Sequence, residues 1–363
     1  MLGSLSVLCG QMLVVGLQGQ ELLAEERRLL GNGERGGVVL FRRNITPDLA
    51  GVAALNAAIA KASPADLPPL VAVDQEGGRV MRLGAPALQL PPMRRLGDLG
   101  DVDLVRRVAE AQARELTALG FTMSFAPVAD IHTRDSNPII GDRAFATTPE
   151  RVARFAGAFA EGLGRGGVLS CAKHFPGHGD TTVDSHLALP RVERAEAELR
   201  AIEIASFAAL ARSPAIDSMM TAHVVYPALD GAQPATLSHA ICTDLLRREL
   251  GFSGVLFSDD LEMKALTMPV AESAVRAVLA GCDVLLVCSR ADLAAEAHAA
   301  LVHEAESSPV FSARCEEASG RALAMRRRAV PAPRTSPADL AAAFAASAPV
   351  AAELARRLGA GVS

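Results

Sequence analysis

Eight short apolar runs recur along this 363-residue chain, and they constrain its fold more than any other feature. Each run is rich in β-branched and other apolar residues and lacks the apolar–polar alternation of a strand with one exposed face. Such runs indicate strands that are buried on both faces, as in a parallel sheet. The runs lie at 12–17, 37–41, 70–74, 121–130, 167–175, 217–227, 254–260 and 282–289.

The segments between these runs carry helix signals. Thr148 and Pro149 have the residue types of an N-cap and a first helical residue, Thr46 and Pro47 repeat the pair, and 101–120 has apolar residues at helical spacing. Eight buried strands that alternate with helices predict an α/β fold, a single-domain (β/α)8 or TIM barrel. A doubly wound sheet is the alternative, because periodicity does not show closure. The glycine fingerprint of a dinucleotide site follows none of the strands.

The composition changes near the C-terminus. We expect 1–328 to form the barrel and 329–363 to form a Pro-rich linker followed by a short helical extension, in which Ser336 and Pro337 start an Ala-rich segment. The apolar N-terminus lacks a preceding basic region and is interpreted as a buried first strand rather than a signal peptide. No apolar run of about 18 residues occurs elsewhere, so we expect no membrane span.

Charge and composition narrow the class of partner. The chain has 36 basic and 41 acidic residues, a net charge of −5, and both signs are mixed along it. It has no Trp and a single Tyr, so an aromatic platform for nucleic acid is not expected, and the charge balance disfavours a polyanion or a membrane surface. Six scattered Cys without CxxC spacing indicate a reducing compartment. We therefore expect a protein that acts on a small molecule.

Polar side chains cluster where five consecutive predicted strands end. In a (β/α)8 barrel the chemistry sits at the carboxyl ends of the strands. The densest cluster is "AKHFPGHGDTTVDSHLALP", 172–190, which contains three His and two Asp. The clusters of the third to seventh strands include Asp74, Glu76, Arg79, Arg82, Asp130, His132, Asp135, Asn137, Asp142, Arg143, Lys173, His174, His178, Asp180, Asp184, His186, His223, Asp259 and Asp260. This pattern predicts a functional rim.

Two chemistries suit such a rim. A metal hydrolase needs three or four converging ligands, but the first strand lacks an H-x-H pair, and the Pro-Gly between His174 and His178 breaks the helix that a zincin site requires. Glycoside hydrolysis fits better, because it needs a carboxylate beneath the anomeric carbon and a proton donor at the leaving oxygen. Asp259 or Asp260 is a candidate nucleophile on a rigid strand end, and the fifth loop supplies donors. We predict no catalytic metal.

The motifs "KHFPGHGDTTVDSH", "VDQEGGRV", "GDRAF" and "FSDDLEM" resemble the signatures of family 3 glycoside hydrolases, in particular the bacterial β-N-acetylhexosaminidases of cell-wall recycling. The resemblance runs from about Met12 to Leu286, with the motifs in the order of the family. It implies a cytoplasmic (β/α)8 barrel that removes non-reducing-end N-acetylglucosamine from muropeptides carrying anhydro-N-acetylmuramic acid. It implies no cofactor and no obligate protein partner. It assigns neither the peptide requirement nor the oligomeric state.

The resemblance also implies catalytic roles. Asp259, which follows Ser in the seventh-strand motif, corresponds to the nucleophile, His186 to the proton donor and Asp184 to its partner. Asp260, as the next residue on a strand, is expected to point to the opposite side and to make hydrogen bonds or cap a helix. The implied sugar-binding residues are Asp74, Arg82, Arg143, Lys173 and His174.

A His donor suits this reaction, because its usual pKa of about 6.5 leaves it partly protonated near neutral pH. Asp184, two residues earlier, can fix the tautomer of His186 and stabilise the imidazolium. Double displacement through a glycosyl-Asp intermediate would then retain stereochemistry.

Other functions remain open at this point. The rivals are another family 3 β-glycosidase specificity, a phosphorylase, for which a His donor avoids a second anion beside phosphate, and a muropeptide-binding sensor. A sensor has no need of a paired nucleophile and donor. His132 has no assigned role, His178 is expected to shape its loop with Asp180, and His223 suits either the core or the site.

Overall fold

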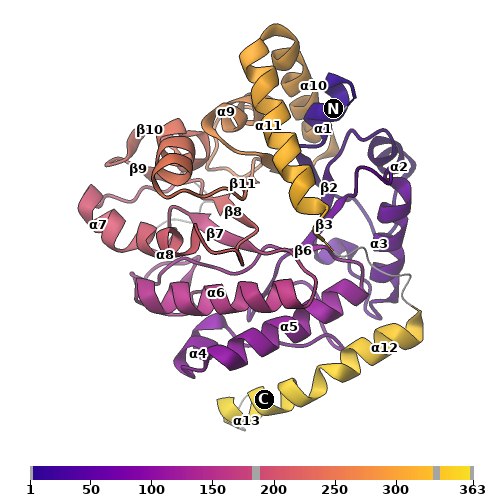
Figure 1. Ribbon diagram of the computed structural model, residues 1–363, viewed down its shortest axis with the longest axis vertical. Helices are drawn as coiled ribbons and strands as arrows, with labels where there is room; N and C mark the ends of the chain where they lie inside the picture. Colours follow the sequence, from indigo (N-terminus) through magenta and orange to yellow (C-terminus); the bar gives the residue numbers. More distant parts are fainter. Residues whose placement is uncertain (1–2, 182–188, 330–335, 360–363) are drawn as a thin grey trace.

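The computed structural model describes residues 3–181, 189–329 and 336–359. Its centre is a parallel sheet in the order β6-β3-β2-β1-β12-β11-β8-β7. Parallel bridges from Met123 to Leu169 and from Val128 to Lys173 join the two edges, so the sheet closes into a barrel (Figure 1). The strands are β1 Leu13–Gly16, β2 Gly37–Leu40, β3 Leu70–Val73, β6 Met123–Ser124, β7 Cys171–Phe175, β8 Ser218–Thr221, β11 Val255–Asp260 and β12 Val284–Val287.

Each barrel strand falls within one of the eight apolar runs, so the predicted (β/α)8 fold is confirmed and the doubly wound sheet is excluded. The helices surround the strands (Figure 1). They are α1 Leu5–Gly10, α2 Ala24–Gly31, α3 Ala50–Ala62, α4 Met93–Asp98, α5 Val102–Ala118, α6 Pro149–Arg165, α7 Glu196–Ala201, α8 Glu203–Leu210, α9 Val270–Ala280, α10 Ala291–Ser307 and α11 Pro309–Arg326.

The loops between these elements contain shorter strands and helical turns. Two antiparallel hairpins follow barrel strands: β4 Gln75–Gly77 with β5 Val80–Met81, and β9 Val225–Tyr226 with β10 Asp230–Pro234. The 3-10 turns are η1 Arg42–Asn44, η2 Gly141–Arg143 and η3 Ala235–Leu237, and η4 Ala240–Glu249 is a π-helix.

Two local predictions differ from the structure. The apolar N-terminus is not strand throughout, because α1 precedes β1. The helix expected to start at Thr46 and Pro47 begins only at Ala50, because Leu49 has a left-handed φ of 58° that separates the Thr46 turn from the helix. By contrast, α6 begins at Pro149, as its sequence predicts.

The barrel interior is filled by apolar side chains and forms the floor beneath the carboxyl ends of the strands. Phe125 and Phe257 meet edge to face there, with ring centroids 5.6 Å apart. A second and larger core packs between the outer face of the sheet and the helices. At the opposite end of the barrel, α11 contributes Ala322 and Met325 to the interior core. Because this interior is closely packed, the polar residues at the strand ends sit on a rigid frame.

The C-terminal extension contains α12 Pro337–Ala346 and α13 Ala348–Leu358, which lie along α5 (Figure 1). The Ser336 side chain caps α12, as its sequence predicts. Within the described part of the chain, Pro337–Leu358 has the length and apolar composition of a membrane-crossing segment, with 17% of its most apolar window buried. One such segment is weak evidence of a span. The expected division between barrel and extension at residues 328 and 329 stays a prediction.

Candidate active site

A cavity of about 200 Å³ opens at the carboxyl ends of the barrel strands. Its walls include Asp74, Arg82, Arg143, Lys173, His174 and Asp259. These six side chains come from four separate loops and strand ends, so the barrel brings together every predicted site residue that the structure describes. The other two, Asp184 and His186, lie outside the described residues, and their pairing stays a prediction. A larger groove of about 810 Å³ lies away from the strand ends, between 86–91 and the C-terminal extension.

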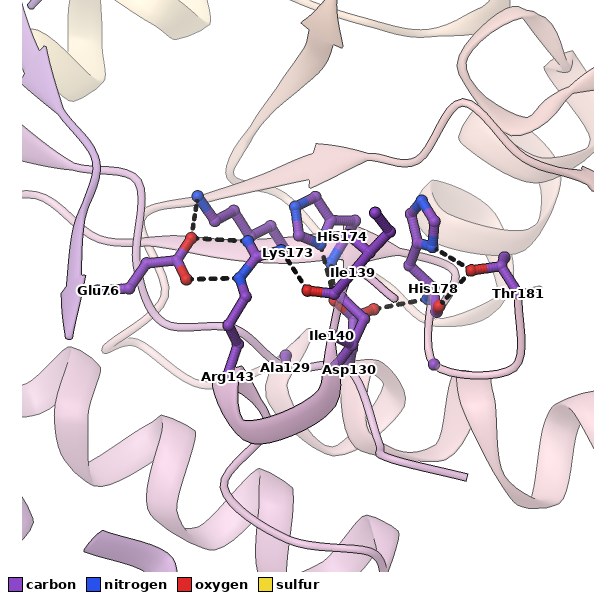
Figure 2. A network of polar contacts seen from close by, with 12 residues as sticks. Glu76, Ala129, Asp130, Ile139, Ile140, Arg143, Lys173, His174, His178 and Thr181 are labelled. Atoms are coloured by element: carbon purple, nitrogen blue, oxygen red, sulfur yellow. Dashed lines mark hydrogen bonds and ion pairs between the residues drawn. The ribbon is translucent and has the colours of Figure 1, made fainter. Parts of the chain in front are cut away.

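Buried acidic and basic side chains alternate along one wall of the cavity and form a network of ion pairs. The Lys173 ammonium donates to Asp74 Oδ1 at 2.9 Å and lies 2.7 Å from Glu76 Oε1. Arg143 donates to both oxygens of Glu76, each at 2.8 Å, and Arg82 donates to Asp74 Oδ2 at 2.9 Å. Figure 2 shows the Glu76 carboxylate joined to both the Arg143 and the Lys173 side chains. Each buried charge therefore has a partner of opposite sign, the condition under which buried ions are tolerated.

Electrostatic interactions keep the acidic and basic side chains of this network ionised. Burial alone would raise the pKa of Glu76, but the positive charges of Arg143 and Lys173 outweigh burial and bring it to about 2. Burial likewise opposes ionisation of Asp74, yet Lys173 and Arg82 hold its pKa below the usual value. Burial would lower the pKa of Lys173, but Asp74 and Glu76 raise it. At neutral pH the wall thus presents fixed carboxylates and cations to the hydroxyls of a ligand.

Glu76 was given no role by the sequence, although it lies in the third-strand motif. The usable signal was its spacing: residues two apart in an extended segment project to the same side, so Glu76 shares the side of Asp74. The segment is extended here, since β4 begins at Gln75, directly after Asp74, and Glu76 is its second residue. Its partner Arg143 is 67 residues away, and that pairing is set by the neighbouring positions of β3 and β6 in the sheet rather than by local sequence.

Asp130 fixes the orientation of His174. Its Oδ2 lies 2.7 Å from His174 Nδ1 and accepts the His174 backbone N–H at 3.1 Å. Because a carboxylate only accepts, Nδ1 carries the proton, and Nε2 is left for a group in the cavity. Asp130 is fully buried; burial would raise its pKa, but the His174 ring keeps it below the usual value. This positioning carboxylate was also missed, since only the fold brings it to the fifth strand.

His178 lies beside His174 in the cavity wall, with the two rings 5.8 Å apart (Figure 2). Its Nδ1 is 2.8 Å from Thr181 Oγ1, and burial, followed by the His174 charge, lowers its pKa to about 4. His178 is therefore neutral at pH 7. Its loop is held by Asn137, whose amide donates to the carbonyls of His178 and Thr181.

The same loop needs Gly179, because a Cβ there would lie 1.7 Å from the Ile131 carbonyl oxygen. The neighbouring acid Asp180 pairs with Arg134 and Arg194 instead of facing the cavity. These contacts fit the expected loop-shaping role of His178 and Asp180.

Asp259 is the second-last residue of β11 and lines the cavity, and its Oδ1 accepts the Asp260 backbone N–H at 2.8 Å. Burial opposes its ionisation, but the neighbouring histidines His223 and His174 hold its pKa below the usual value. An ionised carboxylate on a rigid strand end is suited to attack an electrophilic carbon from a fixed direction.

Asp260 does not point away from the cavity as expected from strand alternation, because it also lines the cavity wall. The regular register of β11 against β12 shifts between Phe257 and Asp260, and this irregularity alters the alternation. Its Oδ1 accepts the backbone N–H groups of Glu262 and Cys288, in keeping with the expected hydrogen-bonding role. Burial, followed by Glu262 and Asp259, raises its pKa to about 7.

The two histidines with open roles lie in different settings. His132 Nε2 is 3.5 Å from the carboxylate of Asp135; the Asp135 side chain is fully exposed, whereas that of His132 is mostly buried. His223 is fully buried, and its Nε2 lies 2.9 Å from the Asp260 carbonyl oxygen. His223 therefore belongs to the neighbourhood of the nucleophile.

No group of three or more His, Cys, Asp and Glu side chains within residues 3–181, 189–329 and 336–359 is arranged to hold a metal ion. The polar groups of the cavity are instead paired acids and bases. A carboxylate at a barrel strand end that shares a cavity with charged groups suited to hydroxyl groups is the arrangement expected of a glycoside hydrolase.

Comparison with known proteins gives the particular family. Residues 4–324 match the glycosyl hydrolase family 3 N-terminal domain. The chain is 40% identical to a β-hexosaminidase of Chromobacterium violaceum over 319 residues, which are 86% of this chain and 87% of the relative. The chain belongs to glycosyl hydrolase family 3, and the resemblance of its motifs is confirmed.

Solved structures support the same assignment. A family 3 β-N-acetylglucosaminidase from Paenibacillus sp. str. FPU-7 superposes with a TM-score of 0.90 and 37% identity, covering 98% of this chain and 68% of that one. NagZ from Neisseria gonorrhoeae, in complex with N-trifluoroacetyl-D-glucosamine, superposes with a TM-score of 0.72 and 34% identity. The superposition covers 86% of this chain and 98% of that one.

Proposed function

We propose that this enzyme is a retaining exo-β-N-acetylglucosaminidase that removes terminal N-acetylglucosamine from muropeptides, including those with anhydro-N-acetylmuramic acid, in cytoplasmic peptidoglycan recycling. The observation that carries the proposal is the Asp259 carboxylate facing one cavity with Asp74, Lys173 and His174. The proposed sugar specificity follows the relatives named β-hexosaminidase and β-N-acetylglucosaminidase.

The charged wall would bind the sugar hydroxyls. Asp74 has two oxygens that accept from adjacent hydroxyls, while Lys173 and Arg143 donate to them. Pairing with Arg82 and Lys173 keeps Asp74 ionised and fixed in place before substrate arrives. A cavity of about 200 Å³ is small beside the roughly 300–1,000 Å³ of drug-sized sites, which supports binding of one sugar ring and hence cleavage from a chain end.

In the proposed first step, an Asp259 oxygen forms a bond to the anomeric carbon as the bond to the leaving oxygen breaks. His186 protonates that oxygen, so the aglycone departs as a neutral alcohol and a glycosyl ester of Asp259 remains. In the second step His186 takes a proton from water, and the oxygen of that water attacks the anomeric carbon and releases Asp259. Two inversions give net retention. The roles of His186 and Asp184 rest on the sequence motif.

A trapping experiment tests this mechanism. A 5-fluoro derivative of N-acetylglucosamine with a good leaving group should form the ester faster than it is hydrolysed. Digestion and mass spectrometry should then find the added sugar on the peptide containing 257–263, and Asp259→Asn should abolish the label. A label on any other carboxylate, or inverted product by NMR, contradicts the proposal.

The rival functions give different results in simple assays. A phosphorylase would produce a sugar 1-phosphate when inorganic phosphate is added, whereas the proposed hydrolase gives free N-acetylglucosamine with or without it. A metal hydrolase would lose activity in a chelator, and a sensor would bind muropeptide without cleaving it. A β-glucosidase would cleave aryl glucosides faster than aryl N-acetylglucosaminides.

A further inference from the structure

We propose that His223 is a positioning residue for the nucleophile: its Nε2–H holds the Asp260 carbonyl and thereby fixes the end of β11 that carries Asp259. The inference rests on the proposed function, because it assigns a task to Asp259. It deepens that function by identifying what keeps the attacking carboxylate at its place in the cavity.

The end of β11 lies beyond its regular pairing with one neighbour. The register of β11 with β8 runs from Val255–Ser218 to Phe257–Met220, so Asp259 is two residues past the last pair. On the β12 side the register shifts between Phe257 and Asp260. The β8 ladder thus stops before Asp259, whereas the β12 ladder continues with a shifted register to the pair of Asp260 with Leu286.

His223 supplies a contact where the β8 ladder has ended. It follows β8 by two residues, and its Nε2 is 2.9 Å from the carbonyl oxygen of Asp260. Because a carbonyl oxygen only accepts, Nε2 carries the proton in this contact. On the other side of the strand, Leu261 donates its backbone N–H to the Leu286 carbonyl at 3.0 Å. The Asp259–Asp260 segment is therefore held from both neighbouring strands.

The imidazole is itself held by the Thr236 hydroxyl, which a second hydroxyl, that of Thr221, holds in turn. Its Nδ1 lies 2.7 Å from Thr236 Oγ1, which lies 2.8 Å from Thr221 Oγ1. Thr236 belongs to η3 and Thr221 to β8, and all three side chains are fully buried. A ring fixed at both nitrogens has one orientation, so the donor reaches the Asp260 carbonyl without further ordering.

The electrostatics of Asp259 support the same role. Burial opposes its ionisation, and His223 is the largest of the influences that lower its pKa, ahead of His174 and Lys173. The ring thus fixes the backbone of the nucleophile, and in its cationic form it would also favour the ionised form of Asp259. A histidine that only filled the core would be expected to do neither.

The test compares His223→Gln with His223→Leu. Gln can offer an N–H near the position of Nε2, whereas Leu keeps apolar volume and removes the donor. We expect Leu to lower kcat about 10- to 100-fold, the effect of unpairing a buried polar group, with KM within about twofold of the wild type. Gln should recover at least about half of the lost effect on a logarithmic scale. The rate of labelling by the 5-fluoro sugar should follow kcat, since it measures formation of the ester directly.

Matched controls separate positioning from folding. His239→Leu changes an exposed histidine beside Asp244 and should leave both rates unchanged. If His223→Leu does not fold, Thr236→Val and Thr236→Ser replace it: Val removes the hydroxyl that faces Nδ1 and should slow labelling, and Ser should restore it.

Defined outcomes overturn the inference. The inference is wrong if His223→Leu, or Thr236→Val in its place, is labelled at a rate within twofold of the wild type. It is also wrong if the Gln and Leu variants of His223, or the Val and Ser variants of Thr236, lose equal amounts of activity. A change in KM alone, with kcat unaltered, overturns it as well. If the wild type itself is not labelled at Asp259, the proposed function fails. If it is labelled and the variants are labelled equally fast, only the role of His223 fails.

Discussion

Glu76 accepts two hydrogen bonds from Arg143, each 2.8 Å long, although its side chain is only 1% exposed. A second cation, Lys173, lies 2.7 Å from the same carboxylate. Glu76 therefore holds two of the predicted sugar-binding cations in one place without needing to touch the sugar itself. Its importance should show when its charge alone is removed.

Glu76→Gln keeps the shape of the side chain but removes the carboxylate that pairs with Arg143 and leaves Lys173 with Asp74 alone. Breaking a buried ion pair from one side costs about 3–5 kcal/mol, so we expect a loss of a few kcal/mol in the free energy of unfolding. We also expect kcat/KM to fall by at least about 100-fold, because misplaced binding groups cost that much. Urea unfolding and steady-state kinetics measure the two effects.

The matched control is Asp142→Asn, which removes an acid that is half-exposed and lies 3.8 Å from Arg79. This exposed pair should contribute less than about 1 kcal/mol. Equal effects in the two variants would show that the buried network of ion pairs contributes no more to stability and activity than the exposed pair does.

The sequence predicts the barrel well because its signals are local. A strand buried on both faces is apolar along its whole length, so Leu70–Val73 and Val284–Val287 are recognisable without their neighbours. Residues at the carboxyl ends of such strands, such as Asp74 directly after β3 and Lys173 within β7, meet because parallel strand ends converge. This geometry is why all six described site predictions line one cavity.

What the sequence missed depends on contacts between distant segments. The side toward which Asp260 points follows from a register shift against β12, and the start of α3 follows from the backbone of Leu49. The partners of Glu76 and Asp130 are more than 40 residues away in the chain. No spacing rule selects one Arg among many for such a contact, whereas the closed barrel does.

Removal of the nucleophile gives a second prediction. Asp259→Gly should lower turnover by at least about 10⁴-fold, because the residue forms the bond that starts the reaction. Added azide can enter the space left by the carboxylate and attack the anomeric carbon once, which inverts it. The expected product from an activated β-glycoside is thus the α-glycosyl azide, identified by NMR.

Asp260→Gly in the same assay is the control, because Asp260 makes hydrogen bonds to the Glu262 and Cys288 backbone instead of lying free for attack. If azide produces the α-azide with Asp260→Gly and not with Asp259→Gly, the assignment of the nucleophile is wrong.

The third prediction concerns Glu203, which is 1% exposed and lies 3.6 Å from Arg194. Burial raises its pKa from 4.5 to about 7, against the attraction of Arg194. A carboxyl whose pKa is higher in the folded state binds more protons there, so the free energy of unfolding falls as the pH rises from about 4.5 to 7. Above pH 7 the whole cost is present.

Glu203→Gln removes this titration and should raise the free energy of unfolding at pH 8 relative to the wild type by on the order of 2–3 kcal/mol. At pH 4 the two proteins should differ little. Denaturant unfolding at the two pH values measures the difference, with Glu198→Gln as a control on the preceding helix. A difference that does not change between pH 4 and pH 8 would mean that folding does not shift the pKa of Glu203.

The last prediction concerns His186, the proposed proton donor. A donor matters in proportion to the basicity of the leaving oxygen, because a nitrophenolate departs without protonation whereas a sugar alkoxide does not. His186→Ala should therefore slow a natural disaccharide by about 10²–10⁴-fold and slow a 2,4-dinitrophenyl N-acetylglucosaminide far less in the bond-breaking step. Pre-steady-state release of dinitrophenolate isolates that step from hydrolysis of the ester, in which His186 acts as the base. His303→Ala, which changes a histidine of α10, should alter neither substrate. An equal loss on both substrates in the burst phase would remove His186 from the role of acid, and the donor would then have to be sought among the other groups of the cavity, beginning with Asp260, whose raised pKa of about 7 leaves it partly protonated at neutral pH.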